Sequence, residues 1–149
     1  MRFIISPAKK MKTDTDTLAP AGLPAYLDRT QELLDWMRKR SLSEMKAVWK
    51  CSDKIAQEAY AQLEKTELKR NLTPAFLSYE GIQYQYMAPA VFEDGQWDYV
   101  QEHVRILSGF YGILRPLDGV VPYRLEMQAK ASDAGSLYAF WGRSLYEYL

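Results

Sequence analysis

The sequence predicts a helix-rich α/β protein, of the α+β kind, with a small sheet. Amphipathic segments with helical spacing occupy most of the chain, and only two short apolar runs, at 2–6 and 75–79, are typical of strands. The length of 149 residues and the hydrophobic fraction of 48% suffice for one domain with a packed core. We therefore expect a single domain over residues 1–149.

The order of elements follows from local patterns. The apolar, β-branched run from Arg2 to Ser6 is ended by Pro7 and predicts a buried strand. Residues 13–23 are rich in Thr, Asp, Pro and Gly and predict a long loop. A second strand is expected at Ala75–Tyr79, followed by a helical turn that carries Tyr84 and Tyr86. Helices are expected wherever a capping residue or a first-turn proline precedes apolar residues at helical spacing: 24–39, 42–49, from 53 to Leu63, 94–107, and from Leu137 to the end.

The most unusual stretch runs from Leu107 to Met127 and reads LSGFYGILRPLDGVVPYRLEM. Its three glycines and two prolines impose a specific, bent backbone path. Charged and aromatic residues are interleaved with them, which favours a functional site over a plain connection between two helices. These residues are Tyr111, Arg115, Asp118, Tyr123, Arg124 and Glu126.

Two interpretations of the arginines stay open. Arg115 and Arg124 could make charge-assisted, fork-shaped contacts to phosphate. They could equally form internal ion pairs with Asp118 and Glu126. A helix that begins at Asp94, ends at Gly109 and is followed by a turn from Gly112 to Pro116 would resemble a helix-hairpin-helix element at about 97–118, although the two glycines stand three apart rather than the usual two.

Four segments carry a family resemblance. The stretch LSGFYGILRPLDGVVPYRLEM closely resembles the signature of the YaaA family of bacterial peroxide-stress proteins, and FIISPAKKM at the start, Cys51-Ser52-Asp53-Lys54 and LYAFWG near the end also match. The resemblance runs the whole length of the chain. It implies a YaaA-like fold, and because family members are typically about a hundred residues longer, we expect this chain to hold the N-terminal portion, with the fold incomplete at the C-terminus.

Composition sets limits on the chemistry. Lys and Arg total 19, as do Asp and Glu, so overall charge gives no argument for nucleic acid and only local basic patches could bind it. One histidine and one cysteine make a zinc or di-iron site improbable, and no phosphate-loop motif is present, so we expect no metal and no cofactor. Cys51 is expected to be a small buried filler rather than a redox sensor, since no resolving partner exists. His103 is not expected to act in catalysis.

Two functions from different classes remain. The resemblance implies DNA binding in the cellular response to hydrogen peroxide, limiting oxidative damage linked to free iron. The alternative is an enzyme acting on a nucleic-acid or nucleotide substrate, with Glu126 or Asp118 as general base and Lys9 or Arg115 stabilising an anion. Phosphate contacts would be weakly sequence-specific, on duplex or single-stranded DNA. The residues expected at the nucleic-acid surface are Ser6, Lys9, Lys10, Lys54, Gly109, Tyr111, Gly112, Arg115, Tyr123 and Arg124, with Tyr84 as a further stacking candidate.

Further expectations concern location and assembly. No apolar run is long enough to span a membrane and the N-terminus has no signal-peptide core, so a cytoplasmic protein with no membrane partner is expected. Residues 130–135 are expected to form a polar loop before Ser136 caps the last helix. The apolar C-terminal helix is expected to leave a patch exposed, or to mediate self-association.

Overall fold

The computed structural model describes residues 3–127, 129, 136–142 and 144–148. Helices and strands occur together, which confirms the mixed α/β class with a small sheet. The elements in chain order are β1 (Phe3–Ile5), α1 (Leu27–Arg38), α2 (Leu42–Trp49), α3 (Asp53–Lys65), β2 (Thr73–Pro74), α4 (Ala75–Ser78), α5 (Ile82–Met87), the 3₁₀ turn η1 (Pro89–Val91), α6 (Asp94–His103), β3 (Val104–Ser108), β4 (Gly112–Leu114), β5 (Gly119–Val120), α7 (Leu137–Trp141) and α8 (Ser144–Tyr148).

The chain divides into two compact units, neither of them continuous in sequence. Unit 1 consists of residues 1–25, 67–108 and 113–122, and unit 2 of residues 26–66, 109–112 and 123–149. The sequence pattern gave one domain and did not anticipate this division; whether the units fold as a single domain stays a prediction. None of the described helices is both long and apolar enough to cross a membrane.

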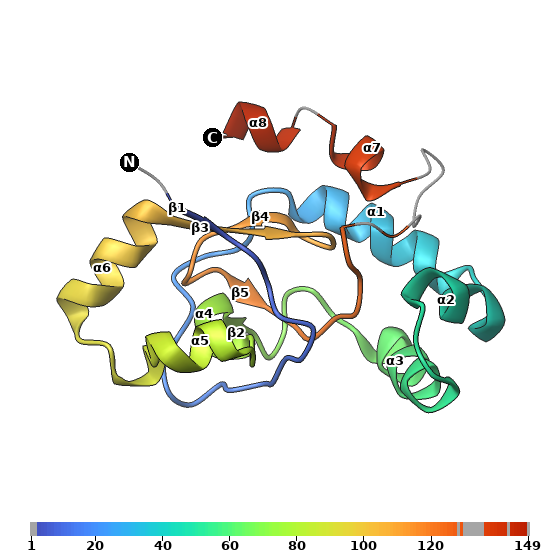
Figure 1. Cartoon of the computed structure of the whole chain (residues 1–149), viewed down its shortest axis with the longest axis horizontal. Coiled ribbons are helices and arrows are strands. Elements are labelled where there is room, and N and C mark those ends of the chain that lie inside the picture. Colours follow the sequence, from blue (N-terminus) through green and yellow to red (C-terminus); the bar gives the residue numbers. More distant parts are fainter. Residues whose placement is uncertain (1–2, 128, 130–135, 143, 149) are drawn as a thin grey trace. The chain divides into compact units, whose positions relative to one another are not determined.

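Unit 1 contains a three-stranded sheet in the order β1-β3-β4, whose strands lie side by side in Figure 1. β1 runs parallel to β3, with Phe3 opposite Val104 and Ile5 opposite Ile106. The predicted strand at 2–6 is therefore confirmed within the described residues, but its predicted burial is wrong. Phe3 is 47% and Ile4 50% exposed, because β1 lies at the edge of the sheet.

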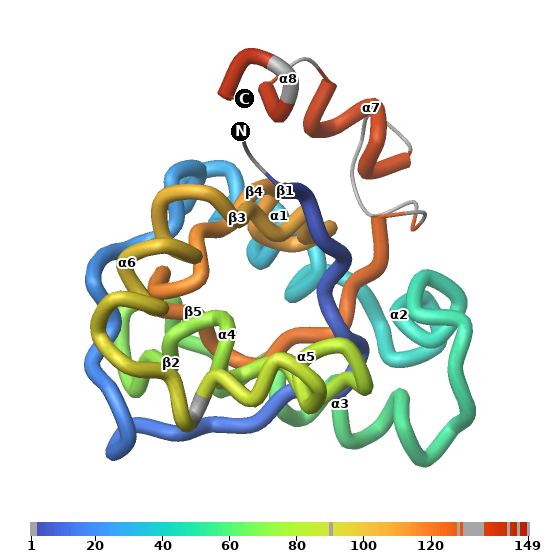
Figure 2. Tube along the Cα trace, turned by 60° about the vertical axis from the view of Figure 1, so that its left-hand side comes forward, coloured from blue at the N-terminus to red at the C-terminus, as the bar shows by residue number. Residues whose placement is uncertain are grey.

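The predicted loop after β1 wraps around unit 1, as the blue trace in Figure 2 shows. The amide of Lys12, just before this loop, donates to the carbonyl of Ser78. Within the loop, the amide of Asp14 donates to the hydroxyl of Thr73 and that of Ala21 to the carbonyl of Leu117. Thr73 also belongs to β2, which pairs antiparallel with β5. This loop is thus fastened at both ends by residues of distant elements.

The structure corrects the prediction of a second strand at Ala75–Tyr79. Only Thr73 and Pro74 form a strand, and Ala75–Ser78 turn into the short helix α4. All residues from Thr73 to Tyr79 are buried. A short, fully buried apolar run has no alternation that could distinguish a strand from a helix.

Unit 2 begins with three helices, of which α2 and α3 start at the predicted caps, whereas α1 starts at Leu27 and not at the predicted residue 24. Ser41 and Glu44 form the complete capping box of α2, and the Ser52 hydroxyl accepts from the amide of Ile55 at the start of α3. In α1 the buried face consists of Thr30, Leu33, Leu34 and Met37, which stand at helical spacing. Local sequence therefore specifies these helices well.

The structure also corrects the predicted helix-hairpin-helix element at about 97–118. α6 ends at His103, and the next residues form a β-hairpin of β3 and β4 instead of a second helix, so the expected helix-hairpin-helix is not what this segment forms. Gly109 is in the hairpin turn rather than at a helix end. The β-branched residues of 104–106 form a strand because β1, about a hundred residues earlier, supplies its partner.

The last helices also belong to unit 2. Ser136 caps α7 as predicted, its hydroxyl accepting from the amide of Ala139. α7 ends at Gly142, which has a φ of 50°, and α8 follows. Leu137 and Trp141 are buried rather than exposed, whereas Tyr138 is exposed. The predicted loop at 130–135 lies outside the described residues.

Candidate functional site

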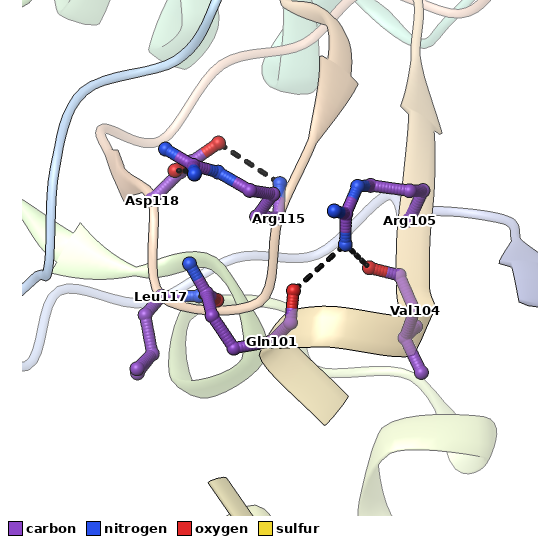
Figure 3. Close-up of polar contacts among 6 residues, drawn as sticks. All are labelled: Gln101, Val104, Arg105, Arg115, Leu117 and Asp118. Atoms are coloured by element: carbon purple, nitrogen blue, oxygen red, sulfur yellow. Dashed lines mark hydrogen bonds and ion pairs between the residues drawn. The ribbon is translucent and has the colours of Figure 1, made fainter. Parts of the chain in front are cut away.

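The candidate site is a turn of unit 1 at residues 115–118, which joins β4 to β5 (Figure 3). The side chain of Asp118 closes it. Its Oδ2 accepts from the backbone amide of Arg115 at 2.9 Å, and its Oδ1 accepts from the Nε of Arg115 at 3.3 Å. The amide of Asp118 in turn donates to the carbonyl of Arg115 at 3.0 Å. One carboxylate thus shapes the backbone and orients a guanidinium.

The rest of the turn is tied to its surroundings. The side-chain oxygen of Gln101, on α6, accepts from the amide of Leu117 at 2.8 Å. The carbonyls of residues 116, 117 and 118 accept from the amides of Phe76, Ala21 and Ala75. Pro116 adds a fixed φ and needs no donor partner. The turn is therefore held from three sides, and its conformation leaves the Arg115 side chain little freedom at its base.

Electrostatics place Asp118 in an unusual environment. The residue is 1% exposed, and burial raises the pKa of its carboxyl, while the hydrogen bonds and charge of Arg115 and the charge of Arg105 oppose that rise. Arg105 is itself 5% exposed, and its Nη1 donates to the carbonyls of Gln101 and Val104. Both carboxylate oxygens of Asp118 accept hydrogen bonds, which offsets part of the cost of burying the acid.

Arg115 is the exposed member of the cluster. Its side chain is 41% exposed, against 2% for that of Asp118. Of the two predicted alternatives, the internal ion pair is therefore confirmed for Arg115. The pair uses Nε, and the two Nη atoms make no hydrogen bond within the described part of the chain. The arginine can thus be anchored and still reach a ligand.

The other residues predicted at the nucleic-acid surface separate by unit. Ser6, Lys9 and Lys10 are exposed in unit 1, directly after β1. The carbonyl of Ser6 accepts from the hydroxyl of Tyr84, and that of Lys10 accepts from the amide of Glu80. Tyr84 is buried against Phe76 and Tyr79, which makes it a packing residue of unit 1.

In unit 2 the hairpin turn at residues 109–112 is packed against other residues of the unit and is not exposed to a ligand. Gly112 has a φ of +80°, and an added Cβ would lie 2.7 Å from the ring of Trp141, whose Nε1 donates to the carbonyl of Gly109 at 2.9 Å. An added Cβ at Gly109 would lie 2.8 Å from the backbone of Glu126. Tyr111 is fully buried, in edge contact with Phe110 and Tyr123. These three residues of the turn are therefore structural.

The remaining predicted residues lie at the surface or margin of unit 2. Lys54 and Glu126 are exposed, and Tyr123 and Arg124 are half-buried. The guanidinium of Arg38 donates to the carbonyls of Leu63 and Thr66 at the end of α3. Cys51 is half-buried between α2 and α3, so the predicted burial is only partial.

Sequence reasoning missed Gln101 and Arg105. Gln101 is an ordinary helix residue by pattern, and only the fold brings it to Leu117. Arg105 gave a signal: a cation inside the apolar run Val104–Leu107 has no simple role unless an acid lies nearby. No group of three His, Cys, Asp or Glu residues is placed to hold a metal ion among the residues that the structure describes.

The fold and this turn define a small α/β protein with a surface arginine fixed by a buried acid. Comparison with known proteins gives the particular family. The chain belongs to the family described as peroxide stress protein YaaA, whose family model matches residues 1–149.

Relatives in two bacteria illustrate the similarity. A protein of Agathobacter rectalis named "UPF0246 protein" is 57% identical over 148 residues, which cover 98% of this chain and 59% of the relative. A protein of the same name in Lactiplantibacillus plantarum is 57% identical over 151 residues, which cover 100% of this chain and 61% of the relative. The chain thus spans about three fifths of the length of the curated relatives it matches.

Proposed function

We propose that the protein acts in the response to hydrogen peroxide by binding DNA, and so limits oxidative damage linked to free iron. Family membership supports the stress role. The observation that carries the DNA part is the geometry of Arg115, a half-exposed guanidinium anchored through Nε by a carboxylate that is almost fully buried. That arrangement leaves the two Nη nitrogens available to a ligand of opposite charge.

Phosphate is the ligand class that suits this geometry. A guanidinium binds a phosphate through two parallel N–H donors, and prior anchoring lowers the entropy lost on binding. Lys9 and Lys10 are exposed in the same unit and can add charge. With a formal net charge of zero, such binding depends on local groups and falls steeply with salt. Little sequence preference is expected, because phosphate contacts carry no base information.

The test is a salt titration of the chain against fluorescent duplex and single-stranded DNA. Arg115→Ala should weaken binding and reduce the slope of log affinity against log salt by about 1. Arg70→Ala is the matched control: Arg70 also pairs with an acid three residues away, Glu67, but both side chains are exposed. It should leave the slope unchanged.

Two outcomes would contradict the proposal. Equal effects of Arg115→Ala and Arg70→Ala would mean that the anchored geometry has no special role. Absence of DNA binding by the folded chain, and also by a full-length relative, would remove DNA as the ligand and leave a smaller phosphate compound to be tried.

An enzyme acting on a nucleic-acid or nucleotide substrate is the alternative. The raised pKa of Asp118 is the observation in its favour, because perturbed acids occur at catalytic sites. Against this role, both carboxylate oxygens of Asp118 already accept hydrogen bonds from Arg115 and the residue is 1% exposed. Among the predicted acids, Glu126 is the exposed one. Hydrolysis of a nucleotide by the folded chain that is lost in Glu126→Gln would favour the enzyme.

A further inference from the structure

β1 is an edge strand with an open side. It pairs with β3 on one side, and among the strands that the structure describes it has no neighbour on the other. In the part of the chain that the structure describes, the backbone of residues 3–5 makes no hydrogen bond outside this sheet. Such an edge offers a row of amide and carbonyl groups to any extended segment that reaches it.

The side chains of β1 are apolar on both faces. Successive residues of a strand point to opposite sides, so Phe3 and Ile4 lie on different faces of the sheet. Phe3 is 47% and Ile4 50% exposed, whereas Arg105 and Ile106 of the neighbouring strand are 5% and 0% exposed. The covering of the sheet therefore ends between β3 and β1.

This pattern is typical of an interior strand. Parallel strands are normally covered on both faces and therefore have continuous apolar sequences. Phe3-Ile4-Ile5 is such a sequence. Protected edge strands usually carry a charge, a proline or a bulge. None occurs within β1, since Pro7 and Lys9 come after the strand has ended. Its sequence is thus adapted to a neighbour on each side.

We propose that the open side of β1 receives an extended segment from the part of the family's length that this chain does not span. In the Agathobacter rectalis relative, 148 aligned residues make up 59% of the length, so about two fifths lies outside the aligned part. The segment adds a strand beside β1 and lays apolar side chains over Phe3 and Ile4. The small sheet thereby becomes larger, and β1 becomes an interior strand.

Hydrogen exchange tests this directly. The 149-residue chain is compared with the same chain fused to the unaligned part of the Agathobacter rectalis relative. In the fusion, amides of residues 3–5 that face the open side should exchange about 100-fold more slowly. Ile4→Glu should reduce this gain at least about tenfold, because it introduces a charge into the new contact.

The control is Ile82→Glu. Ile82 is 71% exposed on α5 of the same unit, so its variant should keep the full gain. The proposal is overturned if the fusion gives no added protection at residues 3–5, or if both variants lose it equally. It is also overturned if protection in the unfused chain rises with protein concentration, since a second copy would then occupy the edge.

Discussion

A single carboxylate, that of Asp118, decides the conformation of the candidate site. Its two oxygens serve the backbone and side chain of Arg115, and the residue also lies in the field of Arg105. Because the group is buried, its ionised form is disfavoured, and ion pairing compensates only in part. The conformation of the turn therefore depends in part on the charge of this side chain.

This dependence gives a pH prediction. Burial raises the folded-state pKa of Asp118 above its usual value of 3.8. As pH rises from below 3.8, the unfolded chain releases this proton first, so the contribution of Asp118 to stability is full below the unfolded pKa and declines as pH passes through the folded one. Asp118→Asn lacks this titration. The difference in free energy of unfolding between wild type and variant should therefore shrink as pH rises, in urea denaturation series.

Glu44→Gln is a suitable comparison. The pKa of Glu44 is lowered, first by its hydrogen bond with the amide of Ser41, so its contribution has the opposite sign and is lost as pH falls. A wild-type advantage over Asp118→Asn that grows with pH would contradict the assigned direction of the shift.

Residues were predictable where their role is local. The density of special residues in 107–127 indicated a bent path, and the turn at 115–118 fits that expectation, whereas a functional site in this stretch stays a prediction. The ion pair of Arg115 with Asp118, three residues apart, was one of the two alternatives considered. Gln101 was not predictable, because it lies sixteen residues from Leu117 and no pattern connects the two.

Among elements, capping chemistry was the reliable signal. Ser41, Ser52 and Ser136 all cap helices, because a hydroxyl next to free amides is a short-range interaction. The strands β3 and β4 were missed for the opposite reason. A strand of three to five residues is stabilised mainly by pairing with a neighbouring strand, and the partner of β3 lies about a hundred residues earlier in the sequence.

The β3–β4 hairpin provides an element-scale prediction. Gly112→Ala places a Cβ 2.7 Å from the Trp141 ring at a φ of +80°, so both backbone strain and overpacking should destabilise the chain. We expect a loss of about 2–4 kcal/mol in urea unfolding. Gly95→Ala is the control: no atom lies within 4 Å of its added Cβ, and α6 should gain up to about 1 kcal/mol.

A similar change for the two variants would contradict the packing described here. Loss of the near-ultraviolet signal of Trp141 in Gly112→Ala, with helical content retained, would place the damage at the hairpin turn itself. The sequence marks Gly112 as an unusual residue but does not explain why a glycine is needed there. The ring that excludes a Cβ belongs to Trp141, which is 29 positions away.

At the scale of the whole molecule, the chain alternates between two units. Unit 1 consists of residues 1–25 and two later segments, and the hairpin turn 109–112, which lies between those two segments in sequence, belongs to unit 2. Charge is balanced over the same chain at 19 cations and 19 anions, so the fold must gather basic groups locally if it binds DNA. The charge balance can be read from the sequence, but the division into two units cannot, because it depends on contacts between distant segments.

The alternation predicts how fragments behave. Residues 67–122 contain β3, β4, β5 and the turn of Arg115 but lack β1, which pairs with β3, and Ala21 and Gly22, which bind Leu117 and Gly119. This fragment alone should show no cooperative thermal transition by circular dichroism. Addition of the peptide 1–25 should restore ordered structure, because that peptide supplies both missing contacts. A scrambled 1–25 peptide serves as the control, and cooperative unfolding of 67–122 by itself would show that unit 1 does not need its N-terminal segment.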